Sequence, residues 1–203
     1  MKSMVPAGLV LLSFSCWIVS CSDEIETVED MSAPDTPTPP PQSIPSPPEN
    51  APAPDMRCTN GRIETVLYAI DGDTIALDND DQEHVRFIGM DTPELYGDGG
   101  PECYAQEAAD TTEARVGGVD VCLIYDPAVE AQSGNIDYYG RTLAYVFFGD
   151  GFERFLNAEL IEEGYAYDYP YTDGAAYEEY FAELEAYAFD AGLGLWSACS
   201  VSP

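Results

Sequence analysis

The sequence predicts an α+β fold that is mainly β, in which five short strands close into a barrel accompanied by about three helices. Short runs rich in Val, Ile, Leu and Tyr, bounded by Gly, Asn or Asp, fill the middle of the chain and are typical of strands. Longer stretches with apolar residues at helical spacing occupy its last third. The residues from Cys58 to Pro203 suffice for one hydrophobic core and are few for two, so we expect a single domain.

The five strands are expected, in chain order, at residues 62–70, 74–77, 84–89, 119–125 and 141–148. The Asp71-Gly72-Asp73 turn separates the first two strands, and residues 79–82 form the next turn. Gly149-Asp150-Gly151 ends the last strand. This order predicts a strand meander with a helix inserted before the fourth strand.

The three helices are expected at residues 102–116, 156–163 and 175–190, with Pro101 at a first helical position. Five short strands, an inserted helix and two terminal helices fit the five-stranded OB-fold barrel, whose strand faces and loops commonly bind oligonucleotides. Because one fold carries many activities, the function has to come from individual residues.

Residues 1–20 have the composition of a lipoprotein signal peptide. Lys2 precedes an apolar run from Val5 to Val19, which is too short to span a bilayer comfortably. The segment Ile18-Val19-Ser20-Cys21 resembles a bacterial lipobox, in which Cys21 becomes the lipidated first residue. We therefore expect a protein of the bacterial cell envelope, anchored by lipid to the outer membrane; the alternative is ordinary secretion after cleavage nearby.

Residues 21–57 are expected to form an acidic, Pro-rich, disordered tether. Ten prolines lie between Pro34 and Pro54, and this density excludes helix and sheet and favours extended polyproline II. Such a segment could hold the domain of residues 58–203 on the order of 60 Å from its anchor.

The cysteines agree with export. Besides the two cysteines of the first 21 residues, four remain, an even number that predicts two disulfides in an oxidising compartment. Of the three possible pairings we favour Cys58–Cys199, which closes the two domain ends, and Cys103–Cys122, which joins the first helix to the next strand. The alternative is a zinc site, but these cysteines lack the two-residue spacing of zinc knuckles, and His84 is not near them in sequence.

Four short motifs carry chemistry: DGDT at residues 71–74, Arg86, DTPE at residues 91–94 and YGR at residues 139–141. Carboxylates are hard oxygen ligands for a divalent cation, and the arginine fork binds phosphate bidentately. Lys2 is the only lysine, so two of the few basic side chains lie inside these motifs. Together with VRFIGMDTPE, DYYGRTLAYV, NAELIEEGYA and GLWSAC, the motifs resemble the thermonuclease family of staphylococcal-nuclease-like domains from about residue 62 to residue 196.

The resemblance implies a Ca²⁺-dependent endonuclease that hydrolyses phosphodiester bonds of DNA and RNA with little sequence preference and leaves 3′-phosphate ends. The implied calcium ligands are Asp73, Asp91 and the Thr92 carbonyl, the implied general base or water-orienting group is Glu94, and the implied phosphate-binding groups are Arg86 and Arg141. Candidates for base stacking are Tyr139, Tyr169 and Tyr171, although the Tyr-rich run of residues 165–171 could equally pack in the core. Tyr138 stands where relatives often have a lysine, and their lysine-rich loop becomes residues 95–100.

Other hydrolytic mechanisms lack their residues. His84 is the only histidine, it lies two residues before Arg86 on an expected strand, and no GxSxG-like elbow is present, which argues against a Ser-His-Asp or Cys-His mechanism. The glycines of residues 97–100 lack a Walker lysine, which excludes a P-loop.

The charge is unusual for a protein that binds nucleic acid. The formal net charge is −31, and from Cys58 onward thirty acidic residues face five arginines, whereas nucleic-acid binders are commonly basic. We interpret the acidic surface as an adaptation to saline water, where salt screens long-range repulsion. Two further hypotheses remain open, a catalytically inactive OB-fold nucleic-acid-binding module and an acidic Ca²⁺-binding surface lipoprotein. We expect a monomer, and nothing in the sequence implies a protein partner.

Overall fold

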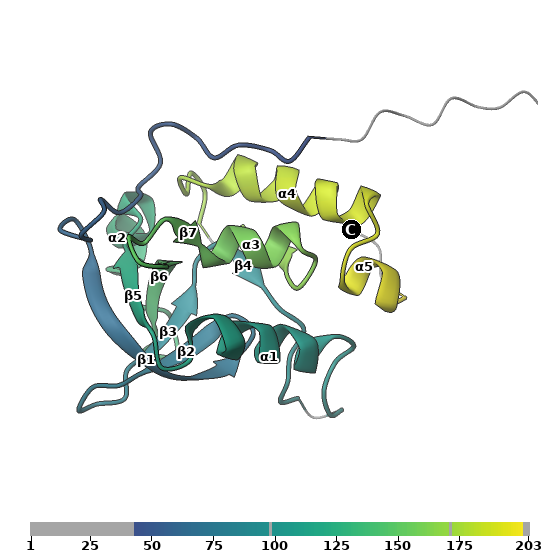
Figure 1. Ribbon diagram of the computed structural model, residues 1–203, viewed down its shortest axis with the longest axis horizontal. Helices are drawn as coiled ribbons and strands as arrows, with labels where there is room; N and C mark the ends of the chain where they lie inside the picture. Colours follow the sequence, from purple (N-terminus) through teal and green to yellow (C-terminus); the bar gives the residue numbers. More distant parts are fainter. Residues whose placement is uncertain (1–42, 98, 171, 201–203) are drawn as a thin grey trace, which may run out of the picture. The chain divides into compact units, whose positions relative to one another are not determined.

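The computed structural model describes residues 43–97, 99–170 and 172–200. The expected signal peptide, Cys21 and Tyr171 lie outside the described residues. The strands β1 (Arg62–Asp71), β2 (Thr74–Leu77), β3 (His84–Phe87), β5 (Asp120–Ile124) and β6 (Thr142–Phe148) form the barrel. They pair in the order β3-β2-β1-β5-β6, antiparallel throughout, and a parallel pairing of β3 with β6 closes the barrel (Figure 1). The predicted α+β class and five-stranded OB-fold barrel are confirmed.

Three two-residue strands supplement the barrel. β4 (Met90–Asp91) pairs with β8 (Tyr167–Asp168), and β7 (Arg154–Phe155) pairs with β6. The third barrel strand ends at Phe87, two residues earlier than predicted, because Gly89 turns the chain with a φ of 79°. A Cβ at Gly89 would lie 2.7 Å from the Phe181 ring, so glycine is required there.

The three predicted helices are present as α1 (Ala105–Val116), α3 (Leu156–Glu162) and α4 (Glu178–Asp190), and α3 and α4 lie side by side (Figure 1). α1 begins later than residue 102, because Tyr104 adopts a left-handed φ of 73°; Pro101 therefore lies in the preceding loop and not in the first turn. Within the described residues, no helix is both long and apolar enough to cross a membrane.

Two short helices were not predicted, α2 (Pro127–Ser133) and α5 (Leu195–Ala198). α2 follows Asp126, whose side chain accepts hydrogen bonds from the backbone N–H groups of Ala128 and Val129. Asp126 followed by Pro127 is a helix-start signature, so this helix was detectable in the sequence. The same carboxylate accepts a hydrogen bond from the Tyr145 hydroxyl, which joins the start of α2 to β6.

The core contains one polar side chain that ties α3 to the barrel. Asn157 is fully buried; its Oδ1 accepts a hydrogen bond from the Val146 N–H at 2.9 Å, and its Nδ2 donates to the Ile88 carbonyl at 2.9 Å. Because β6 and the segment after β3 each provide one partner, Asn157 fixes both to α3. These are the two segments that lead to the candidate site.

The last part of the expected tether lies against the domain. Ala51 packs on the hydrophobic core, the Tyr177 hydroxyl donates to the Pro52 carbonyl at 3.1 Å, and Asn60 Nδ2 donates to the Ala53 carbonyl at 2.7 Å. The structure thus differs from the expectation that residues up to 57 are disordered. The physical reason is that small apolar residues of this segment cover aromatic side chains of the domain.

Two disulfides are present, but the predicted pairing is wrong. The structure joins Cys58 to Cys122, with Cα atoms 5.8 Å apart, and Cys103 to Cys199, with Cα atoms 5.9 Å apart. The register of β1 and β5 places Ile63 opposite Cys122 and so brings the start of β1 to β5. The second bridge instead joins the residue before the first turn of α1 to the end of α5.

Candidate active site

The DGDT motif forms the turn between β1 and β2 and holds the DTPE segment through Asp73. Asp73 is buried, and its Oδ2 accepts hydrogen bonds from the Thr92 N–H at 2.8 Å and the Thr92 hydroxyl at 3.0 Å. A Cβ at Gly72 would lie 2.7 Å from the Thr92 side chain and 2.8 Å from Ala108, so only glycine permits this approach. The two motifs, nineteen residues apart, are thus in direct contact.

Arg86 lies at the centre of the candidate site. It sits on β3 opposite Thr74, and only 6% of its side chain is exposed. Nη1 lies 3.1 Å from Asp73 Oδ2 and donates to the Met90 carbonyl at 2.8 Å, while Nη2 lies 2.5 Å from Asp91 Oδ1. The guanidinium therefore bridges two of the predicted metal ligands and orients β4.

Asp71 belongs to this carboxylate group, although the sequence analysis assigned it no role. Its Oδ1 accepts a hydrogen bond from the Gly72 N–H at 2.8 Å, and its Oδ2 faces the Leu95 N–H at 3.5 Å. Burial, together with the negative charge of Asp73, raises the pKa of Asp71 above its usual range. The signal was present in the sequence, because Asp71 stands two residues before Asp73 in one motif.

The predicted base lies next to the same charges. Burial raises the pKa of Glu94, and the carboxylates of Asp71, Asp73 and Asp91 raise it further. Burial likewise raises the pKa of Asp91, although the Arg86 guanidinium opposes the shift. The charges of Asp73 and Asp91 therefore act on Glu94, and Arg86 contacts both of these aspartates.

The donor set fits a divalent cation in type and in charge. Two carboxylates contact the Arg86 guanidinium, and Asp71 and Glu94 lie near enough to feel the charges of this group; hard oxygen ligands with excess negative charge are what Ca²⁺ prefers. Among residues 43–97, 99–170 and 172–200, however, no group of three or more His, Cys, Asp or Glu side chains is arranged as a metal cage. Arg86 contacts both Asp73 and Asp91, so the geometry described here is that of a guanidinium-bridged carboxylate pair.

Arg141 follows a tight turn whose geometry is set by Asp137. Asp137 Oδ1 accepts the N–H groups of Tyr139 at 2.9 Å and of Arg141 at 2.8 Å, and its Oδ2 lies 2.6 Å from Arg141 Nε. Burial alone would raise the pKa of Asp137, but the hydrogen bonds from Arg141 lower it below its usual range. The Arg141 guanidinium lies over the Tyr139 ring, 5.4 Å from its centroid.

Thr74 connects the two arginines. Its hydroxyl donates to Asp73 Oδ1 at 2.9 Å and accepts a hydrogen bond from Arg141 Nη1 at 3.4 Å. Since Asp73 also pairs with Arg86, the chain Arg141–Thr74–Asp73–Arg86 places both predicted phosphate-binding groups in one network. Roles for Thr74 and Asp137 were not predicted, although Thr74 stands within DGDT and Asp137 opens the stretch DYYGRTLAYV.

The described tyrosines are exposed to different degrees. Tyr138 is 95% exposed and Tyr139 is 78% exposed, and their rings meet edge to face with centroids 5.5 Å apart. Tyr169 is 48% exposed, and its N–H donates to the Gly89 carbonyl at 3.1 Å, next to the β4–β8 pair. Tyr139 thus lies beside Arg141, whereas Tyr169 lies nearer the segment that carries Asp91.

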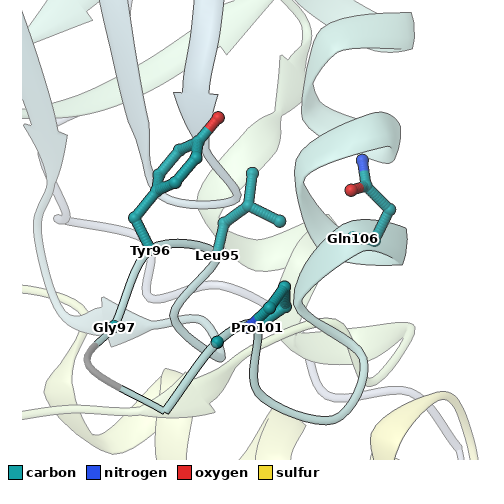
Figure 2. Close-up of a pocket in the computed structure, with 6 residues that line it drawn as sticks. Leu95, Tyr96, Gly97, Pro101 and Gln106 are labelled. Atoms are coloured by element: carbon teal, nitrogen blue, oxygen red, sulfur yellow. The ribbon is translucent and has the colours of Figure 1, made fainter.

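Two shallow clefts border the site. One, of about 650 Å³, is formed by the loop after Glu94 and the start of α1, where Leu95 and Tyr96 lie across from Pro101 and Gln106 (Figure 2). The other, of about 460 Å³, lies between the β2–β3 turn and the Arg141 turn and is lined by Asn79, Asp81, Gln82, Glu83, His84, Tyr139, Gly140 and Arg141. His84 is exposed at the rim, as expected, and takes no part in the carboxylate group.

Comparison with known proteins agrees with this geometry. The family model of staphylococcal nuclease homologues matches residues 84–198, which include Arg86, the DTPE segment and Arg141. This chain belongs to that family. It is 35% identical to the thermonuclease of Staphylococcus hyicus over 140 residues, which cover 68% of this chain and 78% of that protein.

Two further relatives extend the comparison. The thermonuclease of Staphylococcus intermedius is 36% identical over 138 residues, covering 67% of this chain and 77% of its own length. An uncharacterized protein of Methanocaldococcus jannaschii is 26% identical over 151 residues, covering 65% of this chain and 70% of its own. The family model therefore covers the part of the domain that runs from β3 to α5.

Proposed function

We propose that this staphylococcal nuclease homologue is a Ca²⁺-dependent nuclease that hydrolyses phosphodiester bonds of DNA and RNA with little sequence preference. The observation that carries the proposal is the hydrogen-bonded chain Arg141–Thr74–Asp73–Arg86 beside Glu94 and Asp91. It combines two phosphate-binding guanidiniums with a group of partly uncompensated carboxylates. The family membership and the thermonuclease relatives support the same activity.

The residues that would hold Ca²⁺ are the carboxylates of Asp73 and Asp91 and the carbonyl of Thr92, with Asp71 close enough to contribute charge. A bound divalent cation supplies electrostatic stabilisation of the phosphate oxygens in the transition state. The excess of carboxylates over guanidiniums supports this assignment, because the site as described is negatively charged without a cation.

Glu94 is suited to orient the attacking water and accept its proton. Burial and the neighbouring carboxylates raise its pKa above that of an ordinary glutamate, which strengthens it as a general base. Arg86 is rigidly held and would bind the phosphate as charge develops on its oxygens. Arg141, which is 26% exposed, would reach the leaving oxygen from the other side of the network.

We further propose that the protein acts outside the cytoplasm, attached to the bacterial envelope through a lipid on Cys21. The two disulfides support an oxidising compartment. The lipobox-like segment supports lipid attachment and has to be tested by mass spectrometry of the membrane fraction. A Cys21→Ala variant that still fractionates with membranes would contradict the anchor without affecting the nuclease proposal.

The decisive test of activity is a plasmid-nicking and RNA-cleavage assay with residues 22–203. We expect cleavage at millimolar Ca²⁺, none with excess chelator, and restoration when Ca²⁺ is returned. Glu94→Gln and Arg86→Lys serve as loss-of-function controls that separate the protein's own activity from a contaminating nuclease. A folded protein that binds DNA without cutting it would identify an inactive binding module, and one that binds only Ca²⁺ would identify an acidic calcium-binding lipoprotein.

A further inference from the structure

Glu94 stands at the start of a loop that one residue closes. The Glu94 N–H donates to Glu102 Oε2 at 2.9 Å, and the Glu102 N–H donates to the Glu94 carbonyl at 2.9 Å. Both backbone polar groups of the predicted base are thus bonded to a single residue eight positions later. This reciprocal pair is separate from the Asp73–Thr92 contact that holds the DTPE segment two residues earlier.

The described glycines of the loop between these residues border open space. A Cβ at Gly99 or Gly100 would meet no atom within 4 Å, and a Cβ at Gly97 would meet only the Gly100 carbonyl at 3.7 Å. The hydrogen bond from the Leu95 N–H to Asp71 Oδ2 is long, at 3.5 Å, and therefore weak. Glu102 therefore accepts the shorter of the two side-chain hydrogen bonds that reach the backbone N–H groups of Glu94 and Leu95.

Glu102 is in turn held by its neighbours. Cys103, the next residue, is bonded to Cys199 at the end of α5, and α5 is anchored through the buried side chains of Leu195 and Trp196. Tyr104 stacks on Tyr165 with ring centroids 5.5 Å apart. The disulfide thus connects the loop of the predicted base to the C-terminal part of the domain.

We propose that Glu102 is a positioning residue for Glu94 and that the Cys103–Cys199 disulfide keeps Glu102 in place. The inference deepens the proposed nuclease function and rests on it for the role of Glu94. Cys58–Cys122, which joins the start of β1 to β5, has no such connection to the Glu94 loop in the described structure and provides the matched control. One disulfide then serves the geometry of the site, and the other serves the stability of the barrel.

Substitutions at Glu102 test the proposal directly. Glu102→Ala should lower kcat by about 10- to 100-fold with KM changed less than about threefold, since a misplacement of about 1 Å in a reacting group costs this much. Glu102→Gln keeps an acceptor oxygen and should stay within about threefold of the wild-type kcat. Glu153→Ala removes a carboxylate that accepts the Gly151 N–H at 2.9 Å in another turn and should leave kcat unchanged.

The two disulfides are compared in paired serine variants, assayed where circular dichroism shows a folded protein. The double variant Cys103→Ser/Cys199→Ser should have a lower kcat than the wild type even at temperatures at which it is fully folded. The double variant Cys58→Ser/Cys122→Ser should have a lower Tm and an unchanged kcat. Equal kcat in the two double variants would overturn the role of the Cys103–Cys199 bridge.

Amide hydrogen exchange gives a readout that does not require activity. The Glu94 N–H should exchange at least about tenfold faster in Glu102→Ala than in the wild type and should be unchanged in Glu153→Ala, because only the first substitution removes its acceptor. A wild-type protein without nuclease activity would refute the proposed function, yet the exchange would still test the contact. Unchanged Glu94 exchange together with unchanged kcat in Glu102→Ala would overturn the inference.

Discussion

The two arginines of the site occupy opposite environments. Arg86 is 6% exposed in its side chain, bridges two carboxylates and donates to backbone carbonyls, whereas Arg141 is 26% exposed and pairs with one carboxylate, one hydroxyl and one aromatic ring. Arg86 is therefore part of the barrel's own structure, and Arg141 is presented to solvent by a turn. The difference indicates that a loss at Arg86 affects both folding and chemistry, while a loss at Arg141 affects mainly chemistry.

The largest expected effect on activity comes from substitution of Glu94, which belongs to the same part of the site as Arg86. Glu94→Gln removes the proposed base and keeps the size of the side chain, so kcat should fall by about 10² to 10⁴. Steady-state cleavage of an oligonucleotide at saturating Ca²⁺ measures the loss, and an unchanged Tm excludes misfolding. A fall of less than about tenfold would remove Glu94 from its proposed role.

Alanine substitutions compare the two arginines directly. Each should lower kcat/KM by about 10² to 10³, because each removes a positively charged donor from the developing phosphate charge. Arg86→Ala should also cost about 3–5 kcal/mol of unfolding free energy, since it leaves buried Asp73 without its ion partner. Arg141→Ala should cost less, because the Tyr139 and Arg141 backbone N–H groups still bond to Asp137. Equal destabilisation by urea titration would contradict the comparison.

The dependence of kcat/KM on salt concentration tests the exposed part of the site, where Arg141 lies. Each of the five arginines from Arg62 onward lies 2.5–2.9 Å from a carboxylate oxygen, so each is paired with a negative charge of the protein itself. The kcat/KM should hold constant or rise from about 0.05 to 0.5 M monovalent salt, because salt screens the long-range repulsion by the acidic surface.

A single substitution should change this salt response. Tyr138→Lys adds a cation beside Tyr139, at a position that is 95% exposed, and should strengthen binding at low salt. Its log–log salt slope should be more negative than that of the wild type by about 0.7–0.9. Tyr138→Phe keeps the ring without the charge and should retain the wild-type slope. A steep loss of wild-type affinity with salt would show that the acidic surface does not control encounter.

The smallest effect concerns Asp168, in the strand β8 that pairs with β4. Burial, with the charges of Glu185 and Glu178, raises the pKa of Asp168 to about 6. Because the folded-state pKa lies above the unfolded value, this group favours folding less as pH rises from about 4 to about 6, and the penalty is constant above that range. Asp168→Asn should therefore stabilise the protein at pH 7.5 by about 1 kcal/mol, after allowance for solvent screening at this half-buried group, and by less at pH 4.5. Thermal unfolding at the two pH values measures the difference.

The sequence by itself determined the barrel strands, the three longer helices and the motifs from which the candidate site residues come. These features follow from local rules, since alternating apolar runs make strands, Gly-Asp turns end them, and arginines and carboxylates are the side chains that suit phosphate and a hard cation. The even number of four cysteines also predicted two disulfides, which the structure contains, although the predicted partners were wrong.

Only the tertiary structure decided how these residues are joined. The hydroxyl of Thr74 connects the arginines because closure of the barrel places the start of β6 beside β3 and β2. The bridge Cys103–Cys199 and the contact of Glu102 with Glu94 depend on where the α5 end and the Glu94 loop meet the start of α1. Such contacts join residues distant along the chain, so their partners follow from the packing of the whole core and from no local pattern.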